Sequence, residues 1–375
     1  MSREIDRELS RQFDAAERSL ACLHAADTRL RRALERRVQA GVVVSPHRSL
    51  YARAAYWAAL RPDEQMLHII RSLQQAHPTW IFCRQSAGIV WGLPISYRAL
   101  APVHVVTGSH GQLKQQGLEV HVLREESVQT VRGVRVTTLA RTVFDCLRQA
   151  TFVDGLAIAD RALRICEPSR RHELRSELRR LAYRRTGGRR VVGIMGYADP
   201  KSESWAESAA RAHIIMEGFA LPKLQVPFEQ PLNPGHVYYV DMLFMRADGS
   251  QVIGEVDGLE KYWNPAMLAG RSTARVLANE QHRESELTIY GMPVMRISFD
   301  DIMHPAQLYE KLSAYNIPQS DRAAESVRRW AKSSPGSAVF FSQMPLPEPE
   351  ESQRFMQDGD VKNGRLAGGN QADSA

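Results

Sequence analysis

The sequence predicts a protein of mixed α and β structure, with an α+β N-terminal half and an α/β domain in the C-terminal half. Short runs of alternating apolar and polar residues, typical of strands, stand between longer segments whose apolar residues recur every three or four positions, as in amphipathic helices. A stretch rich in arginine and glycine near residues 185–200 separates the two halves. With 375 residues, the chain is long enough for two or three domains with cores of their own.

Composition narrows the functional classes. Hydrophobic residues make up 43% of the chain and charged residues 24%, as in ordinary soluble proteins. The sequence has no run of eighteen apolar residues and no apolar N-terminal signal segment, so we expect a cytoplasmic protein without membrane association. The four cysteines are far apart, and His110, His121 and His282 show no metal-ligand spacing. Phosphate-loop, serine-hydrolase and zinc-protease motifs are absent from the sequence.

Positive charge is concentrated in one segment. The formal net charge is +7, and eleven arginines lie between positions 161 and 190 against three glutamates. Guanidinium groups at this density repel one another unless anions lie nearby. Two interpretations remain open for this segment: a solvated helix followed by a linker, or a surface that contacts phosphates.

Residues 1–60 are predicted to form short helices followed by a β-hairpin. We expect Thr28 to cap a helix over residues 28–39, with Leu30, Leu34 and Val38 on one apolar stripe, and Gly41 to end it. Two apolar runs around residues 45–48 then predict a hairpin.

A helix, a basic helix and a hairpin follow one another in the order of a small winged-helix domain, in which the second helix enters the DNA major groove. The candidate nucleic-acid-binding residues are therefore Arg29, Arg32 and Arg36. A helical hairpin that packs on the next domain is the alternative interpretation.

Helices and strands alternate over residues 61–165 and predict an α+β domain. The expected helices cover 66–77, 139–150 and 152–164, and the expected strands lie within 79–93, 103–108, 118–123 and 134–138. Residues 166–200 are predicted to be a basic helix and a linker.

Residues 201–315 follow the order α-β-β-β-α-β-α. The expected helices cover 202–218, 272–290 and 300–315, and the expected strands cover 225–230, 236–245, 251–257 and 293–298. From 331 to 375 periodicity is lost, which predicts a disordered tail.

Acidic residues lie in, or at the ends of, two strands of this C-terminal domain. Asp241 follows the apolar run VYYV, and Glu255 ends the run VIG. A buried, unpaired carboxylate is costly, so each residue needs a partner or a cation. Two converging carboxylates suit Mg²⁺ or Mn²⁺, which activate water and stabilise charge on a phosphoryl oxygen. Asp257 shares a strand face with Glu255, Lys261 follows, and Glu207 lies on the preceding helix.

This arrangement over residues 201–300 resembles the PD-(D/E)XK nuclease superfamily, and within it the very short patch repair endonucleases. The resemblance implies a restriction-endonuclease-like αβββαβ topology and a catalytic set of Asp241, Glu255, Asp257, Lys261 and Glu207. By the same resemblance, Asp241 and Glu255 are ligands of Mg²⁺ or Mn²⁺, Glu207 is an auxiliary acid, and the carbonyl group of Val256 is a further ligand.

The sequence departs from the superfamily pattern at one position. The E-x-K motif would place lysine at 257, where this chain has Asp257. Lys261, or Gln281 and Arg283 on the next helix, would have to supply the positive charge. The alternative is an inactive domain in which these groups form ion pairs, such as Asp257 with Lys261 or Glu255 with Arg283.

The N-terminal half resembles AbiEi-type antitoxins, which are similar to winged-helix transcriptional regulators. The motifs SAGIVWGLP and VTTLARTVFD carry this resemblance, which extends loosely over residues 1–165. Each motif also has a simpler explanation: Gly92 and Pro94 end a helix beside a packed Trp91, and Arg141 and Asp145 form an i,i+4 pair.

Two functions are therefore expected. The first is a DNA-binding protein with a metal-dependent endonuclease domain. The second is a non-catalytic transcriptional regulator or antitoxin with a degenerate nuclease fold. The expected partners are DNA, a cognate toxin protein and a second copy of the chain.

Overall fold

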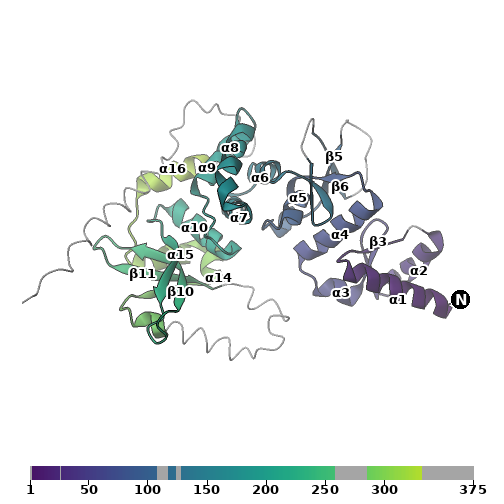
Figure 1. The fold of residues 1–375 in the computed structure, drawn as a ribbon, viewed down its shortest axis with the longest axis horizontal. Coiled ribbons are helices and arrows are strands. Elements are labelled where there is room, and N and C mark those ends of the chain that lie inside the picture. The colour runs from purple at the N-terminus through teal and green to yellow at the C-terminus, as the bar shows by residue number, and fades with distance from the viewer. Residues whose placement is uncertain (1, 26, 108–116, 124–127, 258–284, 332–375) are drawn as a thin grey trace, which may run out of the picture. The chain divides into compact units, whose positions relative to one another are not determined.

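Three β-sheets organise the part of the chain that the computed structural model describes, which comprises residues 2–25, 27–107, 117–123, 128–257 and 285–331 (Figure 1). The chain divides into two units: one contains Met1–Ala150 and Ser169–Leu181, the other Thr151–Pro168 and Ala182–Ala375. The fold is of mixed α and β class, as the sequence predicts. Among the described residues, no helix combines the length and apolar character needed to cross a bilayer.

The first unit begins with helices around a small three-stranded sheet and continues with a five-stranded sheet. Its elements are α1 (Ser2–Arg18), β1 (Leu23–His24), α2 (Thr28–Gln39), β2 (Val43–His47), β3 (Leu50–Arg53), α3 (Ala54–Ala59), α4 (Pro62–Ala76), β4 (Ile81–Phe82), α5 (Arg84–Trp91), η1 (Tyr97–Ala99), β5 (Val103–Thr107), β6 (Leu118–Val122), β7 (Val128–Val131), β8 (Val134–Thr137), α6 (Leu139–Leu147) and, after the first part of the second unit, α8 (Arg171–Ala182).

Helix α2 covers the residues that the sequence predicts, but its cap differs. The N-cap is Asp27, whose side chain accepts a hydrogen bond from the backbone N–H of Arg29 at 3.0 Å; the prediction of Thr28 was wrong. A carboxylate there also complements the positive end of the helix dipole. Leu34 is buried in the core of the small sheet, and Gly41 follows the helix with φ +73°. The hairpin turn lies at residues 48–49, later than expected.

The two sheets of the first unit differ in strand direction. The small sheet has the order β1-β3-β2 and is antiparallel throughout. The larger sheet has the order β6-β5-β4-β8-β7, in which β5 and β6 run parallel, as do β4 and β8. Strand β7, which the sequence analysis did not predict, pairs with β8 through a tight turn at Arg132 and Gly133.

A four-stranded mixed sheet forms the centre of the second unit. Its elements are α7 (Phe152–Ile165), α9 (Gly188–Tyr197), α10 (Trp205–Glu217), β9 (Lys223–Glu229), β10 (Val237–Met245), β11 (Gln251–Val256), β12 (Val294–Ile297), α14 (Phe299–Met303), α15 (Pro305–Ala314) and α16 (Asp321–Ala331); the short η2 (Pro168–Arg170) spans the boundary between the units. The order is β12-β11-β10-β9, with β11 and β12 parallel and the other pairs antiparallel.

Apolar side chains cover both faces of this sheet. Residues of α10, α14 and α15 pack on one face against Met242, Phe244 and Val252 (Figure 1). The other face carries a smaller cluster around Val240, Ile253 and Leu287. Most of the helix expected over 272–290 lies outside the described residues. Within the part that is described, residues 285–288 are helical. The helix expected over 300–315 is interrupted at Pro305, because proline cannot donate the helical hydrogen bond.

Helix α7 belongs to the second unit, where the buried carboxylate of its Asp160 has hydrogen-bond and ion-pair partners. The Asp160 carboxylate pairs with Arg211 of α10 at 2.6 Å and accepts hydrogen bonds from Ser208 and from the Asp199 backbone N–H. The 166–200 segment, expected to be a helix and linker, contains the helices α8 and α9. The expected disordered tail, 331–375, lies outside the described residues apart from Ala331.

Candidate functional site

The predicted metal ligands Asp241 and Glu255 lie on the neighbouring strands β10 and β11. The antiparallel register ends with Met242 paired to Gly254, so Asp241 and Glu255 each lie one residue beyond the last paired position of the two strands. Glu255 is only 8% exposed, and Asp241 is half-buried.

The sheet divides at this residue pair. Beyond Gly254, strand β11 leaves β10 and continues beside β12, with Glu255 next to Arg296 and Val256 next to Ile297. At the division, the Val256 backbone N–H donates to Asp241 Oδ2 at 2.9 Å. Asp241 therefore satisfies a backbone donor that the ladder between β10 and β11 no longer pairs.

A strained residue lies on the other side of Asp241. Gln225 of β9 has φ +49°, in the left-handed region that is unfavourable for residues with a Cβ atom. Its side-chain amide donates to Asp241 Oδ1 at 3.4 Å. Together with Glu203, Tyr238 and neighbouring residues, Gln225 and Asp241 line a cavity of about 480 Å³. The cavity gives a ligand access to the Asp241 carboxylate.

Glu207 lies near the start of α10 and has a structural role there. Its carboxylate accepts hydrogen bonds from the Glu203 backbone N–H and the Ser204 hydroxyl, both at 2.8 Å, and Ser204 is the N-cap of the helix. Burial raises the pKa of Glu207, and the negative charge of Asp241 raises it further. The structure thus brings Glu207 within electrostatic range of Asp241.

Asp257 is paired with a residue that the sequence analysis did not select. Its carboxylate forms an ion pair with Arg296 of β12. Arg296 neighbours Glu255 in the parallel register, so a guanidinium group lies beside the candidate metal ligands. A single arginine in the otherwise apolar run PVMRIS was the available signal. Lys261, Gln281 and Arg283, the cations considered from sequence, lie outside the described residues.

The candidate DNA-binding arginines are exposed on α2. Arg29, Arg32 and Arg36 are all exposed and have no hydrogen-bond or ion-pair partner for their guanidinium groups among the described residues. By contrast, Arg37 of the same helix bonds the Ala33 carbonyl group and pairs with Asp6. The first three arginines are therefore available to an anionic partner.

A second concentration of positive charge lies in the first unit. Arg18, Arg71, Arg132 and Arg135 line a cavity of about 590 Å³, and no acidic residue is among the described residues that line it. Burial lowers the pKa of Arg71, and the charge of Arg132 lowers it further. Like charges held this close favour an anion in the cavity.

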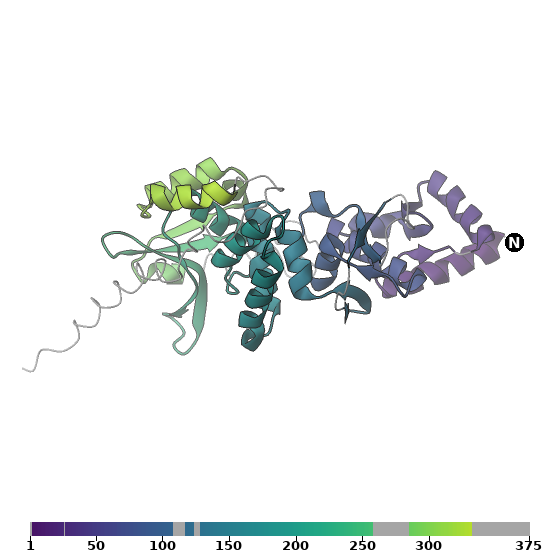
Figure 2. The ribbon, with the colours of Figure 1, turned by 90° about the horizontal axis from the view of Figure 1, so that it is seen from above.

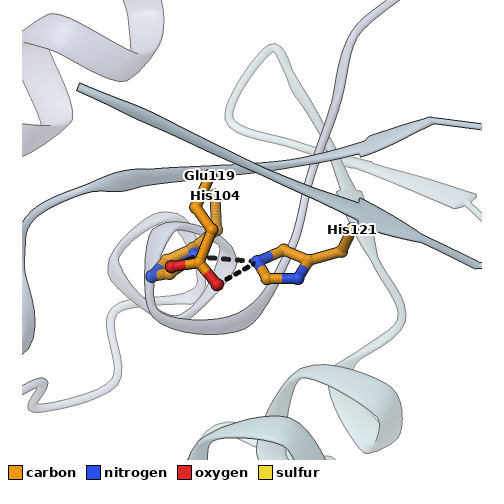
Figure 3. Close-up of side chains that lie close together, drawn as sticks. All are labelled: His104, Glu119 and His121. Atoms are coloured by element: carbon orange, nitrogen blue, oxygen red, sulfur yellow. Dashed lines mark hydrogen bonds and ion pairs between the residues drawn. The ribbon is translucent and has the colours of Figure 1, made fainter. Parts of the chain in front are cut away.

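Two histidines and a glutamate meet on the five-stranded sheet (Figure 3). His104 of β5 neighbours Glu119 of β6 in the parallel register, and His121 follows Glu119 by two residues on the same face. One ligand atom from each of the three lies within 4.8 Å of the other two. The prediction that His121 has no metal-ligand spacing missed this cluster, because parallel strand pairing, not proximity in the sequence, joins His104 to it.

The residues of the two motifs that resemble AbiEi-type antitoxins end a helix, pack in the core or form an ion pair. Arg141 Nε donates to the buried Asp145 carboxylate at 2.7 Å, and the Trp91 indole N–H donates to the Thr137 carbonyl group at 3.1 Å. Gly92, with φ +74°, ends α5. These contacts give the motif residues structural roles, in packing and ion pairing, within the first unit.

Comparison with known proteins gives two similar curated proteins. They come from two strains of Mycobacterium tuberculosis, one of them CDC 1551 / Oshkosh, and both are described as uncharacterized. Each is 27% identical over 203 residues, which cover 53% of this chain and 68% of the relative. No family model and no solved structure matches the chain.

Proposed function

We propose that the protein binds DNA and hydrolyses phosphodiester bonds with a metal-dependent, endonuclease-like site. The observation that carries the proposal is that Asp241 and Glu255 both lie one residue beyond the last pair of β10 and β11, where Asp241 accepts a hydrogen bond from the Val256 backbone N–H. Two carboxylates form a hard-oxygen donor set that suits Mg²⁺ or Mn²⁺. When bound there, such an ion would lower the pKa of a water molecule and stabilise charge on the phosphoryl oxygen.

The protein residues around the site have separate tasks in this proposal. Gln225 and the Val256 backbone N–H orient the Asp241 carboxylate. Arg296 provides the positive charge that the absent lysine at 257 would otherwise supply, although it must share that charge with Asp257. Glu207 contributes negative potential near Asp241 while capping α10.

The described topology supports both parts of the proposal. The order α10-β9-β10-β11 followed by β12 supports the proposed αβββαβ arrangement, whose second helix would fall in the segment between β11 and β12, mostly outside the described residues. In the first unit, α1-β1-α2-β2-β3 places a basic helix before a hairpin, as in small winged-helix domains. The exposed Arg29, Arg32 and Arg36 would contact DNA from that helix.

Incubation of the purified chain with supercoiled plasmid tests the proposal. We expect nicking that requires Mg²⁺ or Mn²⁺ and falls by at least about 100-fold in Asp241→Asn and Glu255→Gln, because each variant removes a charged ligand. Asp248→Asn, an exposed carboxylate in the turn after β10, is the matched control and should cut like the wild type. Equal nicking by Asp241→Asn and the wild type would refute the proposal.

The alternative is a non-catalytic regulator or antitoxin. The ion pair between Asp257 and Arg296 favours it, because a carboxylate stands where a catalytic lysine is expected and engages the nearest described cation. This alternative predicts sequence-specific binding of operator DNA without metal, and capture of a toxin encoded nearby. Metal-independent protection of one DNA sequence, with no nicking under any metal, would favour it.

A further inference from the structure

His104, Glu119 and His121 present their ligand atoms to one point. His104 Nδ1 lies 2.9 Å from His121 Nε2. Glu119 Oε2 lies 3.6 Å from His104 Nδ1, and Glu119 Oε1 lies 3.6 Å from His121 Nε2 (Figure 3). Each imidazole nitrogen thus faces a different oxygen of the Glu119 carboxylate, and one ligand atom from each residue lies within 4.8 Å of the other two.

These separations match the dimensions of a zinc site. Zinc bonds to imidazole nitrogen and carboxylate oxygen are about 2.0–2.2 Å long and tetrahedral, which sets adjacent ligand atoms about 3.3–3.5 Å apart. The 2.9 Å between the two nitrogens, and the 3.6 Å from each nitrogen to one of the two Glu119 oxygens, lie within about half an ångström of that spacing. Two histidines and one carboxylate are also a recurrent donor set of zinc sites with one open position.

The three proposed ligands differ in their exposure to solvent. His104 is buried and His121 is half-buried, whereas Glu119 is exposed.

The backbone holds the ligands in place. The His104 backbone N–H donates to the buried Ser86 hydroxyl at 2.9 Å, and the His104 carbonyl group accepts from the Cys83 N–H at 3.1 Å. Glu119 is exposed, which leaves the site open to solvent. Arg84 lies 3.6 Å from Glu119 and has φ +49°, a strained conformation that keeps its guanidinium group at the edge of the site.

We propose that His104, Glu119 and His121 form a binding site for a divalent transition-metal ion, with zinc as the best fit. An open coordination position would be accessible to solvent, because Glu119 is exposed, and the charge of Arg84, which pairs with Glu119, would favour an anionic ligand there. This site is separate from Asp241 and Glu255, which lie on another sheet and suit harder ions.

Calorimetric titration of the metal-free full-length chain with ZnCl₂ tests the proposal. We expect about one equivalent of tightly bound zinc in the wild type and in Asp241→Asn/Glu255→Gln, and loss of that binding in His104→Gln/His121→Gln. His172→Gln/His236→Gln removes two exposed histidines outside the cluster and is the matched control, with wild-type affinity expected.

Two further measurements distinguish the loss of a zinc ligand from a loss of folding. Glu119→Gln changes an exposed side chain and should leave the circular dichroism spectrum unchanged while weakening zinc binding by more than about 10-fold. Cobalt bound in place of zinc should show visible absorption of a nitrogen and oxygen site without a thiolate charge-transfer band. Unchanged zinc affinity in Glu119→Gln and in the double histidine variant, or no stoichiometric zinc in the wild type, would overturn the proposal.

Discussion

Two buried carboxylates of the second unit have pKa values that are shifted in opposite directions. Burial raises the pKa of Asp160, although Arg211, Ser208 and a backbone N–H stabilise its charged form. For Asp301 of α14, burial alone would raise the pKa, but hydrogen bonds from Lys311 and Ser298 outweigh it and the pKa is lowered. Lys311 Nζ lies 2.6 Å from Asp301 Oδ2, and the Ser298 backbone N–H donates to the same oxygen at 2.7 Å.

The lowered pKa of Asp301 predicts a pH-dependent contribution to stability. Asp301→Asn should lower the free energy of unfolding by about 1–3 kcal/mol at pH 7, because Lys311 and the Ser298 cap lose a charged acceptor. A carboxylate with a lowered folded-state pKa stabilises the fold above its unfolded pKa of about 3.9, and that stabilisation disappears as the pH falls through the folded value. The free energies of unfolding of the wild type and Asp301→Asn, measured with urea, should therefore show their full difference at pH 7. That difference should become progressively smaller below about pH 4. A constant difference across that range would contradict this origin.

At the scale of elements, one of the contacts of the last described helix depends on a glycine. Trp330 of α16 is 4% exposed and lies edge-on to Phe152 of α7, with ring centroids 5.3 Å apart. Gly193 of α9 lies directly under the indole, where a Cβ atom would come within 2.9 Å of the ring. Figure 2 shows α16 as the yellow-green helix on the second unit. The absence of a side chain at 193 is thus what allows α16 to dock.

We expect Gly193→Ala to weaken the docking of α16. Alanine is favoured over glycine by about 1 kcal/mol inside a helix, so any loss of stability must come from the clash with Trp330. Overpacking of this kind typically costs about 1–3 kcal/mol. Hydrogen exchange of the α16 amides should accelerate in Gly193→Ala. In the Trp330→Ala background the same substitution should have no destabilising effect, because the ring is gone; additive losses would exclude the proposed contact.

For the whole molecule, the sequence predicted individual helices and strands better than it predicted which distant strands pair. The strands β9, β10 and β11 and the helix α2 follow from periodicity, as do the positions of Asp241 within β10 and Glu255 within β11. The role of these two residues as metal ligands stays a prediction. The pairing of Asp257 with Arg296 could not be foreseen, because it depends on β11 and β12 lying parallel across 39 residues. His104 and His121, 17 residues apart, meet for the same reason. The sequence analysis assigned the residues of α7 to the domain of residues 61–165. In the structure α7 belongs to the second unit, where its buried Asp160 pairs with Arg211 of α10.

DNA binding by the whole chain should depend on the exposed face of α2. Each lysine or arginine that contacts a phosphate steepens the salt dependence of the binding constant by about one unit on a logarithmic plot. Arg32→Gln/Arg36→Gln should therefore reduce that slope by about two in fluorescence anisotropy titrations of a labelled duplex. Arg322→Gln/Arg329→Gln removes the same charge from exposed positions of α16 and should leave the slope unchanged. If both double variants reduce the slope equally, net charge rather than α2 governs binding, and the winged-helix interpretation of residues 1–60 loses its support.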